Sequence, residues 1–175
     1  EGEILGLVGE NGAGKSTMMN ILFGMSFIHE TGGYEGEVLI DEEVVNFKDP
    51  YDALKAGLGM VHQEFSLIPG FTATENILLN REITKPNFFS KMFGKKLETL
   101  KRDSMNESAK KAIDMLGLEI PVESKVMDMP VGHKQFIEIA RELSKDNVKL
   151  IIMDEPTAVL TESEADIPVS YTHLR

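Results

Sequence analysis

The chain contains no cysteine and no long apolar run. Without cysteine it can form neither disulfide bonds nor thiolate metal sites, and a reducing compartment is compatible with this composition. A membrane-spanning helix needs about 20 consecutive apolar residues, whereas even the longest purely apolar runs here, such as LIIM at residues 150–153, are far shorter. The opening residues EGEILGLVGENG also lack a basic stretch ahead of an apolar one. We therefore expect neither a disulfide scaffold nor a direct membrane span.

Basic charge is also scarce. The 18 lysines and arginines are outnumbered by 29 acidic residues, which gives a formal net charge of −11. A nucleic-acid-binding protein needs a basic surface to displace counterions from phosphates, so the composition argues against nucleic acid as a partner. An acidic surface is compatible with docking on a membrane protein. The 175 residues, 42% of them hydrophobic, suffice for one domain with a buried core.

Strand-like and helix-like segments alternate along the chain. The apolar pattern predicts buried strands at residues 4–8, 58–62 and 148–153, the last of them fully buried. Two more strands are predicted around an acidic turn, at residues 37–40 and 43–47, and helices are predicted at residues 15–23, 51–56 and 132–143. We expect residues 74–145 to form a mostly helical lobe of the same domain. The alternation predicts an α/β fold with a largely parallel sheet.

The sequence GENGAGKST matches the phosphate-loop pattern G-x-x-x-x-G-K-[ST] at every defined position. Glycines let the backbone turn its N–H groups toward phosphate oxygens, and the following helix adds the positive end of its dipole. Lys15 can supply a charge to the β- and γ-phosphates, and the Ser16 hydroxyl can bind Mg²⁺. A chance glycine turn is the alternative, but the predicted strand before the loop and helix after it favour a nucleotide site. The predicted site comprises Gly9, Glu10, Asn11, Gly12, Ala13, Gly14, Lys15, Ser16 and Thr17.

Two carboxylates, Asp154 and Glu155, follow the most apolar of the predicted strands. Ligands of doubly wound sheets bind at the carboxyl ends of the strands, so this edge should face the phosphate loop. Asp154 can hold Mg²⁺ directly or through water, and Glu155 can accept a proton from the water that attacks the γ-phosphate. Taken alone, a surface acidic turn is an equally simple explanation. The phosphate loop makes catalysis the better interpretation.

Four motifs, taken in order, resemble those of ABC-type ATPases. They are GENGAGKST, VHQEFSLIPGFTATENILL, PVGHKQFIEIAREL and DEPTAVLT, and together they extend over most of the chain. Their wording is similar to the ATPases of simple-sugar and nucleoside importers, and GENGAGKST resembles the first of the two tandem modules found there. The resemblance implies a P-loop NTPase core with a largely parallel sheet, a small antiparallel β part and a helical lobe.

The resemblance also implies roles for single residues. Two modules would sandwich two ATP molecules, each bound by the phosphate loop of one module and the signature loop of the other. Gln63, which alone would be taken for a solvated loop glutamine, would contact the γ-phosphate and Mg²⁺. The signature residues Val131, Gly132 and Gln135 would face the opposing ATP, while Pro130 replaces a usual serine and cannot donate a hydrogen bond. Transmembrane permease subunits would be the partners, which implies a peripheral position on the cytoplasmic face of the plasma membrane.

The two ends of the chain depart from this pattern. The chain begins too late for the upstream strand and the aromatic residue that stacks on adenine in the family, so we expect a domain that is incomplete at both ends. The family-like sequence covers residues 1–166, and IPVSYTHLR at residues 167–175 reads as a non-native tail. His173 lies in this tail, too early for the family's switch histidine. His29, His62 and His133 lack metal-ligand spacing.

The leading hypothesis is an enzyme subunit that couples hydrolysis of ATP, bound with Mg²⁺, to import of a small polar solute. A soluble ABC-type ATPase of DNA repair or translation is one alternative, and the negative charge and missing cysteines count against it. A nucleotide-binding module with impaired hydrolysis is the other. Glu155 argues against it at the chain's own site, whereas Pro130 favours it at the opposing site.

Overall fold

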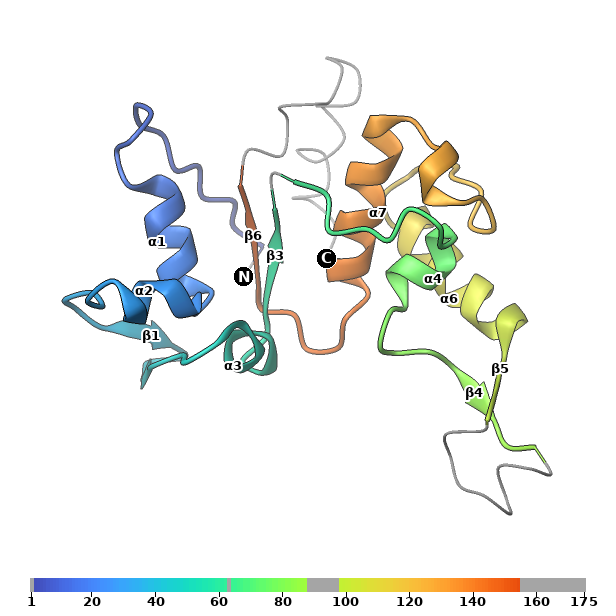
Figure 1. Cartoon of the computed structure of the whole chain (residues 1–175), viewed down its shortest axis with the longest axis horizontal. Helices are drawn as coiled ribbons and strands as arrows, with labels where there is room; N and C mark the ends of the chain where they lie inside the picture. The colour runs from blue at the N-terminus through green and yellow to red at the C-terminus, as the bar shows by residue number, and fades with distance from the viewer. Residues whose placement is uncertain (1, 63, 88–97, 155–175) are drawn as a thin grey trace.

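The computed structural model describes residues 2–62, 64–87 and 98–154. A short parallel sheet stands between two groups of elements (Figure 1). It consists of β3 (Leu58–Val61) and β6 (Leu150–Met153), with Leu58 opposite Leu150 and Val61 opposite Met153. None of the helices in these ranges is long and apolar enough to cross a membrane.

The first group comes from the amino-terminal part of the chain and lies to the left of the sheet in Figure 1. It contains α1 (Lys15–Leu22), α2 (Ser26–Glu30), the antiparallel strands β1 (Val38–Ile40) and β2 (Glu43–Val45), and α3 (Pro50–Lys55). Asp41 and Glu42 join β1 to β2 with positive φ angles of 52° and 68°, as expected for a two-residue hairpin turn. Helix α3 begins one residue before the predicted helix at residues 51–56, and the Asp49 side chain caps it by accepting a hydrogen bond from the Asp52 N–H. The buried core between this first group and the parallel sheet consists of Phe23, Phe47, Ala53, Leu58, Met60 and Ile152.

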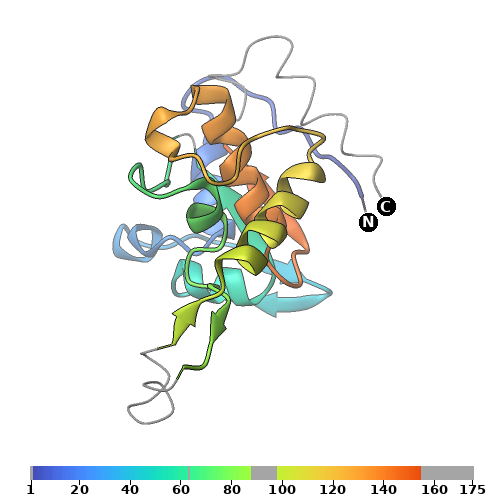
Figure 2. The same cartoon turned by 90° about the vertical axis from the view of Figure 1, so that its right-hand side faces the viewer.

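The second group is mostly helical and lies on the other side of β3 (Figure 2). It contains α4 (Ala73–Ile77), the paired strands β4 (Thr84–Lys85) and β5 (Thr99–Leu100), α6 (Arg102–Asp114), a 3₁₀ turn (Val126–Asp128) and α7 (Val131–Leu143). Thr72 and Glu75 cap α4 reciprocally as a capping box. Helices α4, α6 and α7 bury a common apolar core whose fully enclosed members include Ile77, Met105, Ile113, Phe136 and Ile137.

Three sequence predictions about these elements need correction. Residues 4–8 form no strand, and Leu5 and Val8 are 84% and 94% exposed, because no strand in the described ranges pairs with them. Strand β6 is not fully buried: Leu150 is 46% exposed, since β3 is the one strand paired with β6 there. Residues 74–145, which are predicted to form a mostly helical lobe, also contain the short strands β4 and β5.

A glycine sets the geometry at the amino ends of both parallel strands. Gly57 follows α3 with a φ of +93°, and a Cβ atom at this position would lie 2.5 Å from the Asn147 carbonyl oxygen. The Gly57 carbonyl oxygen accepts a hydrogen bond of 2.8 Å from the Lys149 N–H. The close approach of these two connections begins the register that brings the carboxyl ends of β3 and β6 together.

Candidate nucleotide-binding site

The glycine loop leads into a helix whose N-terminus carries no cap. Gly14 precedes α1 with a φ of 89°, and no side chain accepts a hydrogen bond from the first helical turn. Gly12 has a φ of 84°, and the Ala13 N–H donates to the Glu10 carbonyl oxygen at 3.1 Å, which closes the turn. Residues 9–14 are all exposed. The unpaired N–H groups and the positive end of the helix dipole are therefore available to an anion.

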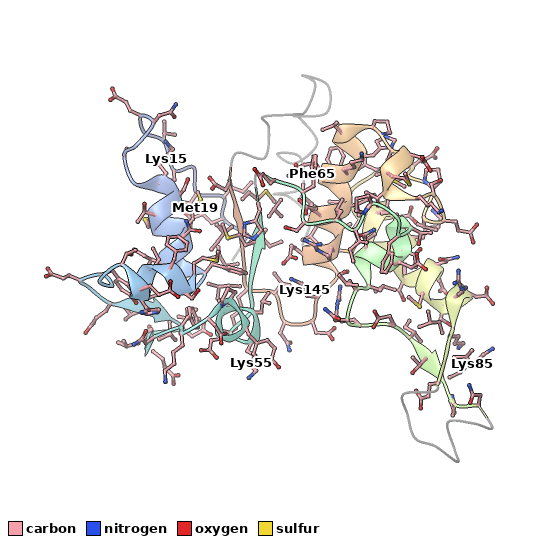
Figure 3. The ribbon with its side chains drawn as sticks, viewed as in Figure 1. Lys15, Met19, Lys55, Phe65, Lys85 and Lys145 are labelled. Atoms are coloured by element: carbon pink, nitrogen blue, oxygen red, sulfur yellow. The ribbon has the colours of Figure 1, made fainter. Side chains whose placement is uncertain are left out.

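The Lys15 side chain folds back over this loop (Figure 3). Its Nζ donates to the Gly9 carbonyl oxygen at 2.8 Å and to the Glu10 carbonyl oxygen at 3.0 Å. Both acceptors are neutral, whereas a phosphate oxygen is charged and adds an attraction between opposite charges to its hydrogen bond with the ammonium group. A phosphate entering the loop can therefore draw Lys15 away from these carbonyls at little cost.

Ser16 connects the loop to the parallel sheet. Its Oγ lies 3.4 Å from Asp154 Oδ1, although 138 positions separate the two residues in the sequence. Asp154 directly follows β6, and its N–H donates to the carbonyl oxygen of Val61, the last residue of β3. The structure thus confirms that the carboxyl end of this strand faces the glycine loop. The functional roles of these residues stay predictions.

Ser16 and Asp154 offer a hydroxyl and a carboxylate, the oxygen ligands that Mg²⁺ prefers. Within the described ranges no group of three or more His, Cys, Asp or Glu side chains could hold a metal ion. A Mg²⁺ ion bound by Ser16 and Asp154 would take its further oxygens from water and nucleotide phosphates. This donor set fits an ion that enters together with a nucleotide.

The other predicted site residues fall into two sets. Gln63 and Glu155 lie outside the described residues. In the first turn of α7, Val131 is 45% exposed, while Gly132 is buried and Gln135 is 2% exposed. Within a single chain, Val131 is thus the most accessible of these three signature residues, and their contact with an opposing nucleotide stays a prediction.

Sequence reasoning missed a cluster of buried charges on α7. Glu138 and Glu142 are 1% and 3% exposed, and Arg141 lies between them and is within 3.5 Å of both carboxylates. Burial raises the pKa of Glu138, while the Ser66 N–H and Arg141 act in the opposite direction. These charges occur at the helical spacing of the apolar face, which is the signal that could have revealed them.

A phosphate loop that opens a helix and a carboxylate at the end of a parallel strand together define a P-loop nucleotide-binding protein. Comparison with known proteins identifies the family within this class. The family model described as "ABC transporter" matches residues 1–158. The chain therefore belongs to the ABC transporter family, as the order of its four motifs predicts.

Curated relatives are ATP-binding proteins of sugar import. A xylose import ATP-binding protein of Photobacterium profundum is 42% identical over 167 residues, which is 95% of this chain and 30% of that protein. A ribose import ATP-binding protein of Bacillus licheniformis is 40% identical over 166 residues, again 95% of this chain and 30% of that protein. The chain thus spans about a third of the length of these relatives.

Solved structures confirm the ABC ATPase fold. A nucleotide-free ATP-binding cassette of an ABC transporter superimposes with a TM-score of 0.69 at 27% identity, over 94% of this chain and 63% of that one. A dimeric cassette in a post-hydrolysis state, bound to ADP and Pi, superimposes with a TM-score of 0.66 at 27% identity, over 93% of this chain and 64% of that one.

Proposed function

We propose that this chain binds ATP with Mg²⁺ and hydrolyses it as part of a module that powers import of a small polar solute, a sugar or a nucleoside. The contact between Ser16 and Asp154 carries the proposal, because it unites the phosphate loop and the acidic strand end in one site. The import proteins for xylose and ribose among the relatives favour a sugar as the solute.

The loop residues would bind the phosphates. Backbone N–H groups at the start of α1 would donate to phosphate oxygens, and Lys15 would exchange the Gly9 and Glu10 carbonyls for phosphate oxygens. Ser16 and Asp154 would hold the Mg²⁺ ion, whose charge offsets that of the β- and γ-phosphates when it is bound.

Hydrolysis would depend on two residues outside the described ranges. Glu155 would accept the proton of the attacking water, and Gln63 would contact the γ-phosphate and Mg²⁺. We expect Glu155→Gln to preserve ATP binding and to block turnover. Robust hydrolysis by this variant would remove the role assigned to Glu155.

A second ATPase module would complete each site. Val131, Gly132 and Gln135 would then belong to the loop that meets the ATP of the opposing module, either in a tandem polypeptide or in a dimer. Permease subunits that span the membrane would carry the solute, with the ATPase module bound at their cytoplasmic face. Pro130 is the N-cap residue of α7 and has no hydrogen-bond donor. The contact with the opposing ATP would therefore shift to neighbouring backbone groups.

Calorimetric titration of Mg-ATP into the chain tests the proposal. We expect saturable binding to the wild type and none to Lys15→Ala, because that variant loses the mobile charge of the loop. Lys85→Ala is the matched control, since Lys85 is an exposed lysine in β4 at the far end of the molecule (Figure 3). Circular dichroism would confirm that all three proteins are folded. A folded wild type that binds no nucleotide, or equal binding by Lys15→Ala, would refute the proposal.

A further inference from the structure

Buried side chains bind the backbone N–H and C=O groups of two residues, Ser66 and Ile68, in the segment that follows Gln63. The Ser66 N–H donates to Glu138 Oε1 at 2.5 Å, and the Ser66 carbonyl oxygen accepts from Arg141 at 3.0 Å. Two residues later, the Ile68 N–H donates to Asn76 Oδ1 at 2.7 Å and the Ile68 carbonyl oxygen accepts from Asn76 Nδ2 at 3.1 Å. Residues 66–68 are therefore fastened to α7 and to α4 at once.

The side chains that hold these peptides are deeply buried. Glu138 is 1% exposed, Asn76 is fully buried, and the Arg141 side chain is 15% exposed. Ser66 and Ile68 themselves are exposed and lie outside any helix or strand. Burying a carboxylate and an arginine is costly unless they are well paired. Apolar residues at these positions would pack α7 without that cost, so packing alone does not account for the charges.

We propose that Asn76, Glu138 and Arg141 form a clamp that positions the chain following Gln63 and thereby sets the reach of Gln63 toward the nucleotide. The inference rests on the proposed function, because it takes the contact of Gln63 with the γ-phosphate and Mg²⁺ from that proposal. The three residues are positioning residues: they touch the backbone of Ser66 and Ile68 and not the nucleotide. Gln63 lies three residues before Ser66, so movement of the Ser66 peptide is transmitted through a very short length of backbone.

The clamp makes a prediction that a purely structural role does not. If Gln63 contacts the γ-phosphate as well as Mg²⁺, loosening the clamp should weaken Mg-ATP binding more than Mg-ADP binding, because ADP lacks the γ-phosphate. General destabilisation of the domain would lower both affinities together. The ratio of the two affinities is therefore the diagnostic measurement.

Four variants test the clamp in the full chain, with Mg-ATP and Mg-ADP titrated separately by calorimetry. Glu138→Ala removes the acceptor of the Ser66 N–H, whereas Glu138→Gln retains an acceptor oxygen at the same position. Arg141→Lys removes the planar group that reaches the Ser66 carbonyl. Arg81→Lys is the control: Arg81 is a partly buried arginine that ties α4 to the end of α7 through the Ile77 and Ser144 carbonyl oxygens, and it also donates to the Arg141 carbonyl oxygen at 3.3 Å, but its side chain forms no hydrogen bond with Ser66 or Ile68.

We expect Glu138→Ala to lower the affinity for Mg-ATP by up to about tenfold, because losing one charge-assisted hydrogen bond can lower the population of the clamped conformation by about that factor and binding has to restore it. Arg141→Lys should act in the same direction, and it preserves the inference as testable if Glu138→Ala does not fold. Glu138→Gln and Arg81→Lys should stay within about twofold of the wild type. Amide hydrogen exchange followed by NMR supplies an independent measurement: the Ser66 N–H should exchange about tenfold faster in Glu138→Ala than in the wild type.

Equal losses of Mg-ATP and Mg-ADP affinity, or no loss in folded Glu138→Ala and Arg141→Lys, would overturn the clamp and leave the proposed function intact. Rapid exchange of the Ser66 N–H in the wild type would also overturn it, whatever the nucleotide affinities. A wild type that binds neither nucleotide would instead refute the proposed function, and the inference about Gln63 with it.

Discussion

Alanine at Gly57 would place a methyl group between the two connections that lead into the parallel sheet. Gly57 has a φ of +93°, and an ideal Cβ there would lie 2.5 Å from the Asn147 carbonyl oxygen and 3.0 Å from Lys149 Cγ. Real Cβ atoms essentially never approach another heavy atom within 3.0 Å. The nearest atom is backbone, which cannot rotate away, so the connection before β6 has to move.

Two effects contribute to the expected loss of stability. An alanine in the left-handed region costs about 1–2 kcal/mol, and forcing a methyl group into a filled space costs about 1–3 kcal/mol. Alanine also restricts the unfolded chain relative to glycine, which offsets about 0.4–1 kcal/mol. We therefore expect Gly57→Ala to lower the free energy of unfolding by about 1–4.6 kcal/mol. For a domain of this size that corresponds to a melting temperature lower by roughly 2–18 °C.

Gly33→Ala separates the two effects. Gly33 has a φ of +79°, and a Cβ there would meet no heavy atom within 4 Å. This control carries the backbone strain without the steric conflict, so it should lose no more than about 1–2 kcal/mol. Urea unfolding of both variants, followed by circular dichroism, measures the difference. Equal losses in Gly57→Ala and Gly33→Ala would show that the close approach to Asn147 contributes nothing, and the reasoning would be refuted.

Three further predictions concern a cap, a buried acid and the metal site. Thr72→Ala removes the acceptor of the Glu75 N–H at the start of α4, so the free energy of unfolding should fall by about 1 kcal/mol; an unchanged urea midpoint would contradict this. Burial raises the pKa of Glu138 above its ordinary value of 4.5, so the protonated form is favoured in the folded state. Its contribution to stability is thus greatest below pH 4.5 and declines as the pH rises through the folded-state pKa. Glu138→Gln should abolish that decline. If stability falls with pH at the same slope in wild type and variant, Glu138 is not the source of the decline. Asp154→Asn should weaken ATP binding about tenfold or more in the presence of Mg²⁺ and leave Mg²⁺-free binding unchanged. Titrations with and without Mg²⁺ measure this, and an equal loss in both would contradict a role of Asp154 in holding the ion.

The outline of the site could be predicted because local sequence determines it. Glycines with positive φ and a lysine at the start of a helix recur in loops that bind phosphate. The sequence GENGAGKST is therefore enough to predict the conformation of this loop. The meeting of Ser16 with Asp154 was also predictable, since parallel strands present their carboxyl ends at one edge. Residues 4–8 show the limit of such reasoning. Their apolar pattern predicts a strand, but a strand forms only beside a partner, and no described strand pairs with them.

The clamp lies beyond local reasoning for a different physical reason. Helix α7 was predicted from its apolar positions, and charges between them are usually assigned to the solvated face. Glu138 and Arg141 instead face inward, because the peptide groups of a segment some 70 residues earlier supply the hydrogen bonds that make their burial tolerable. The sequence does contain one trace of this arrangement. Glu138 and Glu142 flank Ile139 and Ala140 on α7. The apolar residues of this helix are therefore too few to cover both β3 and the helical core by themselves. A carboxylate and an arginine three positions apart on such a face indicate a buried polar contact with a distant segment, and here that segment is the one that follows Gln63.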